Sequence, residues 1–258
     1  MTPALSLFDL GGRVALVTGA SRGIGARLAR GLAEAGADLA VTARSEPALA
    51  ETVRAIEAAG RRALAIAHDA AEVERARDVV DRVVAGLGRL DILVVNAGVE
   101  EVRASTEVDP ALWERIQRVN LEGAFFAMQA AARHWIARDR PGAIVTICSL
   151  TSFVGVPTAA PYTASKSGLL GLTRALASEW AGRRIRVNAI APGYFRTALT
   201  EPFYADPVWQ ERMLAKIPMG RFGALDDLVG ACIFLASDAA AYVTGQCLAV
   251  DGGYLASI

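Results

Sequence analysis

The sequence predicts a single α/β domain built around a doubly wound, parallel sheet of about seven strands with helices on both faces. Three observations support this prediction. Short apolar, β-branched segments recur along the chain, and segments with the spacing of an amphipathic helix separate them. The third is composition, because 258 residues that are 53% hydrophobic and 21% charged can bury one substantial core.

Seven segments have the length and composition of buried strands. They are residues 13–17, 38–42, 63–67, 91–95, 143–148, 185–190 and 247–250. Between them, apolar residues at helical spacing, such as Leu28, Leu32 and Ala35, predict crossover helices. Repeated strand–helix–strand units have right-handed crossovers and build a parallel sheet, so we expect a Rossmann-type fold.

The chain contains no Pro/Gly/Ser-rich linker, and residues 1–258 are therefore predicted to form one domain. Its least regular part is segment 193–223, where Pro202, Pro207 and Pro218 interrupt short helical pieces. An insertion this late in such a sheet lies over the carboxyl ends of the strands, where ligands bind. We expect it to form the substrate loop region.

Charge and cysteine content exclude several classes of protein. Acidic and basic residues balance at 27 each, which argues against a nucleic acid or membrane partner, and no signal or membrane-spanning segment is predicted. Three widely spaced cysteines (Cys148, Cys232 and Cys247) indicate buried thiols in a reducing compartment, so we expect a cytoplasmic protein. Neither His68 nor His134 has partners at ligand spacing, and no metal site is predicted.

A glycine-rich turn, TGASRGIG at residues 18–25, follows the first predicted strand and opens a helix. Such a turn needs glycine's backbone freedom, and a pyrophosphate approaches a helix N-terminus only where no Cβ blocks it. We therefore predict a dinucleotide-binding turn. Its predicted cofactor-binding residues are Gly19, Ser21, Arg22, Gly23, Ile24 and Gly25.

The end of the second strand bears on the choice of cofactor. An acidic residue there would bind the 2′-hydroxyl of the NAD ribose, but the chain has Ala43 followed by Arg44. Arg44 could pair with a 2′-phosphate, and Arg22 could add a second guanidinium. The alternative is that both are solvated side chains in an arginine-rich protein. We expect NADP(H) in preference to NAD(H).

A phenol and an ammonium lie four residues apart at Tyr162 and Lys166, on one face of a predicted helix. A free tyrosine has a pKa of about 10, and a nearby cation favours the phenolate that base chemistry requires. Lys166 is one of only two lysines among 27 basic residues, so its presence calls for a reason. The alternative interpretation is an interfacial tyrosine beside a lysine that extends toward water.

Two further polar residues occupy informative positions. Ser149 follows the fifth strand, where side chains converge on the ligand-binding crevice, and its hydroxyl could polarise a carbonyl. Asn120 lies within a long predicted helix, which is unfavourable for asparagine unless its amide has a role.

These motifs, with Asn96-Ala97-Gly98 after the fourth strand, resemble the short-chain dehydrogenase/reductase family over essentially the whole chain. The resemblance implies a catalytic tetrad of Asn120, Ser149, Tyr162 and Lys166, in which the asparagine holds a water that connects the lysine to solvent and the lysine contacts the nicotinamide ribose. Further cofactor contacts are implied at Asp69, Ala70, Asn96, Ala97, Gly98, Tyr162, Lys166, Pro192, Gly193, Phe195 and Thr197. The closing segment 250–254 implies a homotetramer, with helix 168–181 as the expected interface.

The resemblance implies an NAD(P)(H)-dependent oxidoreductase that transfers hydride between nicotinamide and a carbonyl or secondary alcohol of a small substrate. Residues 192–202 are similar to sugar-acid members such as gluconate 5-dehydrogenase, so gluconate or 5-ketogluconate is favoured. A 3-oxoacyl thioester or general ketone reductase is the alternative. A non-catalytic cofactor-binding scaffold is the alternative of another class.

Four aromatic residues and two arginines bear on the substrate. Phe195, Phe203, Tyr204 and Trp209 form either an aromatic lid for an apolar substrate or ordinary core anchors. Arg103 and Arg196 are candidates for a substrate carboxylate, but the abundance of arginine gives neither special weight.

Overall fold

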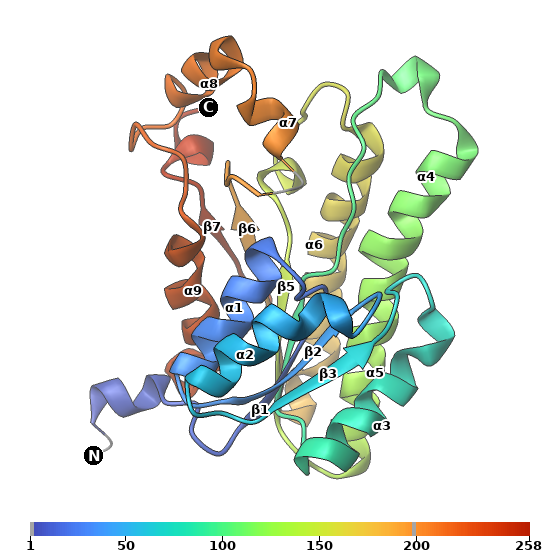
Figure 1. Ribbon diagram of the computed structural model, residues 1–258, viewed down its shortest axis with the longest axis vertical. Coiled ribbons are helices and arrows are strands. Elements are labelled where there is room, and N and C mark those ends of the chain that lie inside the picture. Colours follow the sequence, from blue (N-terminus) through green and yellow to red (C-terminus); the bar gives the residue numbers. More distant parts are fainter. Residues whose placement is uncertain (1–2, 198–199) are drawn as a thin grey trace.

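The computed structural model describes residues 3–197 and 200–258 and confirms the parallel sheet with flanking helices (Figure 1). Seven strands pair in the order β3-β2-β1-β4-β5-β6-β7, all parallel. They are β1 (Val14–Val17), β2 (Asp38–Ala43), β3 (Ala63–Ala67), β4 (Ile92–Val95), β5 (Gly142–Ile147), β6 (Ile185–Pro192) and β7 (Cys247–Val250). The order reverses between β1 and β4, which is where such sheets open a ligand crevice.

The helices of the described part alternate with these strands. They are α1 (Gly23–Glu34), α2 (Ala50–Ala58), α3 (Ala76–Leu87), α4 (Pro110–Gln117), α5 (Gly123–Ala137), α6 (Ala160–Trp180), α7 (Glu201–Tyr204), α8 (Pro207–Leu214) and α9 (Val229–Ala236). A π-helical segment, η5 (Arg118–Glu122), joins α4 to α5, and a short 3₁₀ turn, η6 (Leu150–Ser152), follows β5.

The sheet separates two apolar cores. Alternate residues of each strand face opposite sides, so Val14 and Leu16 pack with α3, α5 and α6, whereas Ala15 and Val17 pack with α1, α2 and α9. Because helices cover both faces of the sheet, each strand appears in the sequence as a continuous apolar run.

The late segment lies beyond the carboxyl ends of β6 and β7, as Figure 1 shows for α7 and α8. Phe195, near the start of segment 193–223, forms an isolated bridge with Gly223 at its end, so the two ends of the segment lie side by side. The chain therefore places its irregular segment at the edge where the glycine turn and the ends of the strands lie.

Candidate active site

Thr18 and Asn96 join the glycine turn after β1 to the loop after β4. The Thr18 hydroxyl accepts hydrogen bonds from the backbone N–H groups of Asn96 (3.0 Å) and Ala97 (3.1 Å). In return, the Asn96 amide donates to the carbonyls of Thr18 (3.0 Å) and Gly19 (2.9 Å). The two segments that the sequence assigned to the cofactor therefore form one rigid unit across the switch point of the sheet.

Two positions of the glycine turn have no space for a side chain. Gly19 has φ +65°, and a Cβ there would lie 2.7 Å from the Cα of Ala97. A Cβ on Gly25 would overlap the Asn96 amide and the Gly19 carbonyl. Helix α1 begins at Gly23 without a side-chain cap or an acidic residue in its first turn, so its free N–H groups suit a phosphate.

The loop after β6 approaches this turn. A Cβ placed on Gly23 would lie 3.8 Å from the Thr197 side chain, so residues 18–25 and 192–197 border the same space. Thr197 is held by Thr200, whose hydroxyl accepts from the Thr197 N–H at 2.9 Å. Gly193 packs so closely on Asp251 that a Cβ would lie 2.7 Å from the Asp251 Cα. The loop is thereby fixed to the end of β7.

The residues expected at the adenosine side lie just beyond β1, β2 and β3. Arg22 and Arg44 are exposed, and neither pairs with an acidic residue within segments 3–197 and 200–258. Ala43, which replaces the acidic residue of an NAD site, ends β2. Asp69 accepts from the Ala71 N–H at 3.0 Å, and a Cβ on Gly123 would overlap the Ala70 carbonyl, so α5 holds this loop. The last residue of β2 is therefore apolar, and an exposed guanidinium follows it.

Three of the predicted catalytic side chains meet at the end of β5. Lys166 is 4% exposed, and its Nζ donates to the Ile147 carbonyl at 2.7 Å and lies 5.6 Å from the centre of the Tyr162 ring. Ser149 caps η6 by accepting from the Thr151 N–H at 3.2 Å, and its side chain lies close enough to Tyr162 to lower the pKa of the phenol. The phenol, the hydroxyl and the ammonium therefore share one site.

The electrostatics of this site differ from the sequence-based expectation that Lys166 lowers the pKa of Tyr162. Burial raises the pKa of Tyr162, the negative charge of Glu100 raises it further, and the Ser149 side chain opposes both. Burial also lowers the pKa of Lys166, which is itself poorly solvated. The groups of the protein alone do not depress the tyrosine pKa, because desolvation of the phenolate dominates.

Asn120 is fully buried in the π-helical segment η5, not in a continuous α-helix as the sequence suggested. Its Oδ1 accepts from the Val99 N–H (2.8 Å), and its Nδ2 donates to the Val99 carbonyl (2.8 Å) and to Ser165 (3.1 Å). The wider turn of a π-helix is common at functional sites because it redirects side chains and backbone groups. Asn120 thus ties the loop after β4 to α6 beside Lys166.

Two residues at this site were missed by the sequence analysis. Thr18 falls inside the glycine motif, but the pairing that gives it a role, with Asn96, appears only when β1 and β4 lie side by side. Glu100 follows the Asn-Ala-Gly motif and interacts with Tyr162 and Lys166, from which it is 62 and 66 residues distant in sequence. No local pattern signals either contact.

The aromatic residues of the late segment pack mainly on one another. Tyr204 lies 5.2 Å from Trp209 and 4.7 Å from Phe222, measured between ring centres. Phe195 is 3% exposed and packs in the core, which supports its interpretation as an anchor. The side chain of Phe203, the fourth residue of the expected lid, lies outside the described part.

The two candidate arginines for a substrate carboxylate are already paired. Arg196 donates to both oxygens of Glu201, at 2.9 and 2.6 Å. Arg103 pairs with Glu101 and lies 3.7 Å from Asp109. Neither is positioned as a free carboxylate receptor.

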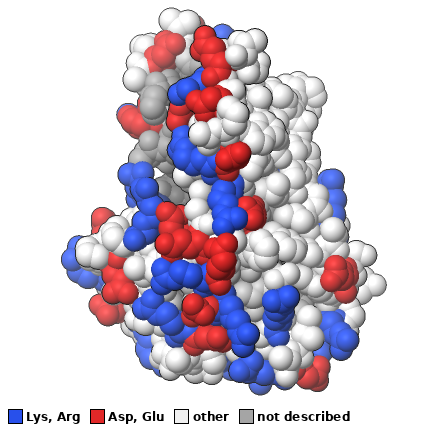
Figure 2. Space-filling model, turned by 90° about the vertical axis from the view of Figure 1, so that its right-hand side faces the viewer, with Lys and Arg blue, Asp and Glu red and all other residues white. Residues whose placement is uncertain are grey.

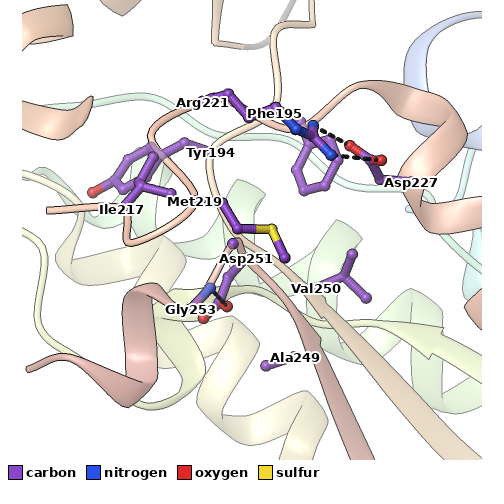
Figure 3. A pocket seen from close by; sticks show the side chains of 12 residues that line it. Tyr194, Phe195, Ile217, Met219, Arg221, Asp227, Ala249, Val250, Asp251 and Gly253 are labelled. Carbon is purple, nitrogen blue, oxygen red and sulfur yellow. Dashed lines mark hydrogen bonds and ion pairs between the residues drawn. The ribbon is translucent and has the colours of Figure 1, made fainter. Parts of the chain in front are cut away.

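A cavity of about 340 Å³ opens beside the late segment, between the loop after β6 and the end of β7 (Figure 3). Its walls combine apolar side chains, among them Phe195, Ile217 and Met219, with Asp251 and the ion pair of Arg221 with Asp227. None of the tetrad residues lines it. Within the described residues, no group of three His, Cys, Asp or Glu side chains could hold a metal ion.

Comparisons with known proteins agree with this geometry. Residues 19–255 match a family model described as enoyl-(acyl carrier protein) reductase. The chain is 44% identical over 252 residues to 2-dehydro-3-deoxy-D-gluconate 5-dehydrogenase of Escherichia coli (strain K12), covering 98% of this chain and 99% of that protein.

Solved structures are also similar over nearly the whole chain. A putative short-chain alcohol dehydrogenase from Sinorhizobium meliloti 1021 superposes with a TM-score of 0.95 at 62% identity, covering 98% of this chain and 100% of that chain. A gluconate 5-dehydrogenase from Burkholderia cenocepacia J2315 in complex with NADP and tartrate has a TM-score of 0.95 at 42% identity, covering 99% and 100%.

Proposed function

The chain belongs to the short-chain dehydrogenase/reductase family, and we propose that it oxidises a sugar acid of the gluconate class with NADP as its preferred cofactor. It is an NAD(P)-dependent oxidoreductase that acts on a CH–OH group. The observation that carries the proposal is the meeting of Ser149, Tyr162 and Lys166 beside the joined glycine turn and β4 loop.

In this proposal each tetrad residue has a distinct role. Ser149 orients the substrate oxygen by hydrogen bonding, and Tyr162 takes the hydroxyl proton during oxidation or returns it during reduction. The bound nicotinamide supplies or accepts the hydride, and its oxidised form adds a positive charge that favours the phenolate. Lys166 holds the ribose and hydrogen bonds to Ile147.

Asn120 completes the set as a positioning residue and part of the proton path. Its side chain already forms hydrogen bonds with Val99 and Ser165. We therefore assign the water that connects Lys166 to solvent to the second lone pair of the Asn120 Oδ1 or to the Asn120 main-chain carbonyl. The cofactor in turn lies along residues 19–25, 69–70, 96–98 and 192–197, which border the crevice.

The NADP preference rests on the free guanidinium groups of Arg22 and Arg44 and on Ala43 at the end of β2. Charged hydrogen bonds of this kind contribute about 1.5–3 kcal/mol each, which is about 10- to 150-fold in affinity. We expect kcat/KM for NADPH to exceed that for NADH, and Arg44→Asp to reverse the preference. Arg54→Asp, at an exposed arginine of α2, is the matched charge control and should leave the ratio unchanged.

The sugar-acid substrate is inferred from relatives that are named gluconate 5-dehydrogenase and 2-dehydro-3-deoxy-D-gluconate 5-dehydrogenase. One observation favours the 3-oxoacyl thioester alternative, namely the apolar side chains of Phe195, Ile217 and Met219 that form part of the cavity wall. Absorbance of NADPH across sugar acids, ketoses, 3-oxoacyl thioesters and simple ketones tests the choice. Turnover of the thioesters alone would reject the sugar-acid proposal.

A homotetramer in the cytoplasm completes the proposal. Figure 2 shows a broad area without charged side chains on one side of the molecule, next to a dense band of mixed charge, which suits a subunit interface. The proposed contact is segment 168–181, which comprises the C-terminal part of α6 and the residue that follows it. Light scattering should give four times 27.1 kDa, and a monomer would contradict the assignment. No described helix has the length and apolar character needed to cross a membrane.

A further inference from the structure

Two residues close the π-helical turn in which Asn120 lies. The backbone N–H of Gly123 donates to the carbonyl of Arg118, five positions earlier, which is the hydrogen bond that defines a π-helix. Asn120 lies between these two residues, is fully buried, and has its amide hydrogen bonded to Val99 and Ser165. The shape of the turn from Arg118 to Gly123 therefore determines where Asn120 lies.

The same two residues contact the loop after β3. The Arg118 Nε donates to the Ala71 carbonyl at 3.0 Å. A Cβ on Gly123 would overlap the Ala70 carbonyl oxygen, so the backbone of Gly123 packs directly against this loop. The π-helical turn and the loop of residues 69–71 are therefore held together at both ends of the turn.

The guanidinium of Arg118 donates from all three of its nitrogens. Besides the bond to Ala71, Nη2 donates to Glu74 at 3.0 Å and Nη1 donates to Glu122 at 2.5 Å. Glu74 lies in the 3₁₀ turn that continues the loop (Val73–Arg75), and Glu122 ends η5. Both carboxylates are exposed, so these ion pairs mainly orient the rigid fork of Arg118 toward the Ala71 carbonyl.

The loop that Arg118 holds lies at the adenosine end of the proposed cofactor site. At the start of the loop, the His68 N–H donates to the carbonyl of Ala43, the last residue of β2, at 2.8 Å. Arg44 follows directly, and the proposed function assigns to it the 2′-phosphate of NADP. One end of the loop thus adjoins the proposed phosphate site, and the other end contacts the turn that contains Asn120.

We propose that Arg118 is a positioning residue that couples the adenosine end of the cofactor site to Asn120 through the loop of residues 69–71. This inference rests on the proposed function. A cofactor that orders the loop stabilises the π-helical turn through Arg118, and a loop without this contact no longer supports the turn. Arg118 therefore has two effects, one on the affinity for the cofactor and one on turnover through Asn120.

Arg118→Ala tests both effects. The dissociation constants for NADPH and for 2′,5′-ADP, a fragment with the adenosine end alone, should rise by the same factor, about tenfold, because the lost contact lies at that end. The kcat at saturating NADPH should also fall by about tenfold, because Asn120 loses its exact position. Arg77→Ala removes an exposed arginine of α3 whose partner, Asp81, is in the same helix, and this control should match the wild type.

A double-mutant cycle separates positioning from a general loss of structure. Asn120→Ala keeps Ser149, Tyr162 and Lys166, and with them a slower turnover that NADPH absorbance follows. In this background Arg118→Ala should no longer lower kcat, because the residue through which it acts is absent, but it should still raise both dissociation constants. Arg118→Lys keeps the charge without the fork and should recover only part of the affinity; it replaces Arg118→Ala in the cycle if melting shows that the alanine variant does not fold.

The outcomes separate this inference from the proposed function. An equal loss of kcat with and without the Asn120 side chain would overturn the coupling and leave the oxidoreductase proposal standing, and so would unchanged dissociation constants in a folded Arg118→Ala protein. Failure of the wild-type protein to bind NADPH or to turn over any substrate of the panel would instead reject the proposed function.

Discussion

Replacing Thr18 by valine tests whether the cofactor site depends on the joint between the β1 turn and the β4 loop. Valine has nearly the same shape, but the N–H groups of Asn96 and Ala97 lose their common acceptor at 3.0 and 3.1 Å. Thr18 is 6% exposed, so water replaces the hydroxyl poorly. Each buried N–H left unpaired costs about 1–3 kcal/mol, and part of this is recovered by burying a methyl group.

The net effect should be a loss of about 2 kcal/mol in the free energy of unfolding, or about 4–8 °C in melting temperature for a chain of this size. The affinity for NADPH should fall by about tenfold, because the two loops no longer hold one geometry. Calorimetric melting and fluorescence titration measure these quantities. Thr42→Val is the matched control, since Thr42, in β2, is also buried and its hydroxyl forms no hydrogen bond in the described part. Equal, small effects of the two substitutions would refute the reasoning.

Two other predictions address the turn and the proton. Gly25→Ala should weaken NADPH binding by about tenfold or more in a titration, because its Cβ overlaps Asn96 and Gly19, whereas Gly230→Ala in α9 meets open space and should leave binding unchanged. Glu100→Gln should shift the rising limb of the pH profile of kcat/KM for alcohol oxidation to lower pH. The reason is that loss of a negative charge lowers the pKa of Tyr162, and oxidation requires the phenolate. A shift of this limb to higher pH would contradict the prediction.

The sequence was sufficient for the architecture because hydrophobic runs and helical spacing are local signals. The strand expected at 91–95 is β4 (Ile92–Val95), and that expected at 143–148 is β5 (Gly142–Ile147). The glycine turn and the Tyr162 helix also follow from motifs of a few residues. Parallel strands then bring such motifs to one edge without further information.

The remaining features depend on contacts between distant segments. Asn120 was expected in a regular helix, but its hydrogen bonds to Val99 and Ser165 accompany a π-helical segment that no propensity scale signals. The raised pKa of Tyr162 has the same origin, because it depends on burial and on Glu100, and both arise only in the folded protein.

The central claim is that the Tyr162 phenol carries the proton of a hydride-transfer reaction. Tyr162→Phe removes only the phenol hydroxyl, so the most direct measurement is NADPH turnover by this variant together with its dissociation constant for NADPH. The account predicts a fall in kcat of about 10²- to 10⁴-fold with an unchanged dissociation constant. Turnover close to that of the wild type would contradict it.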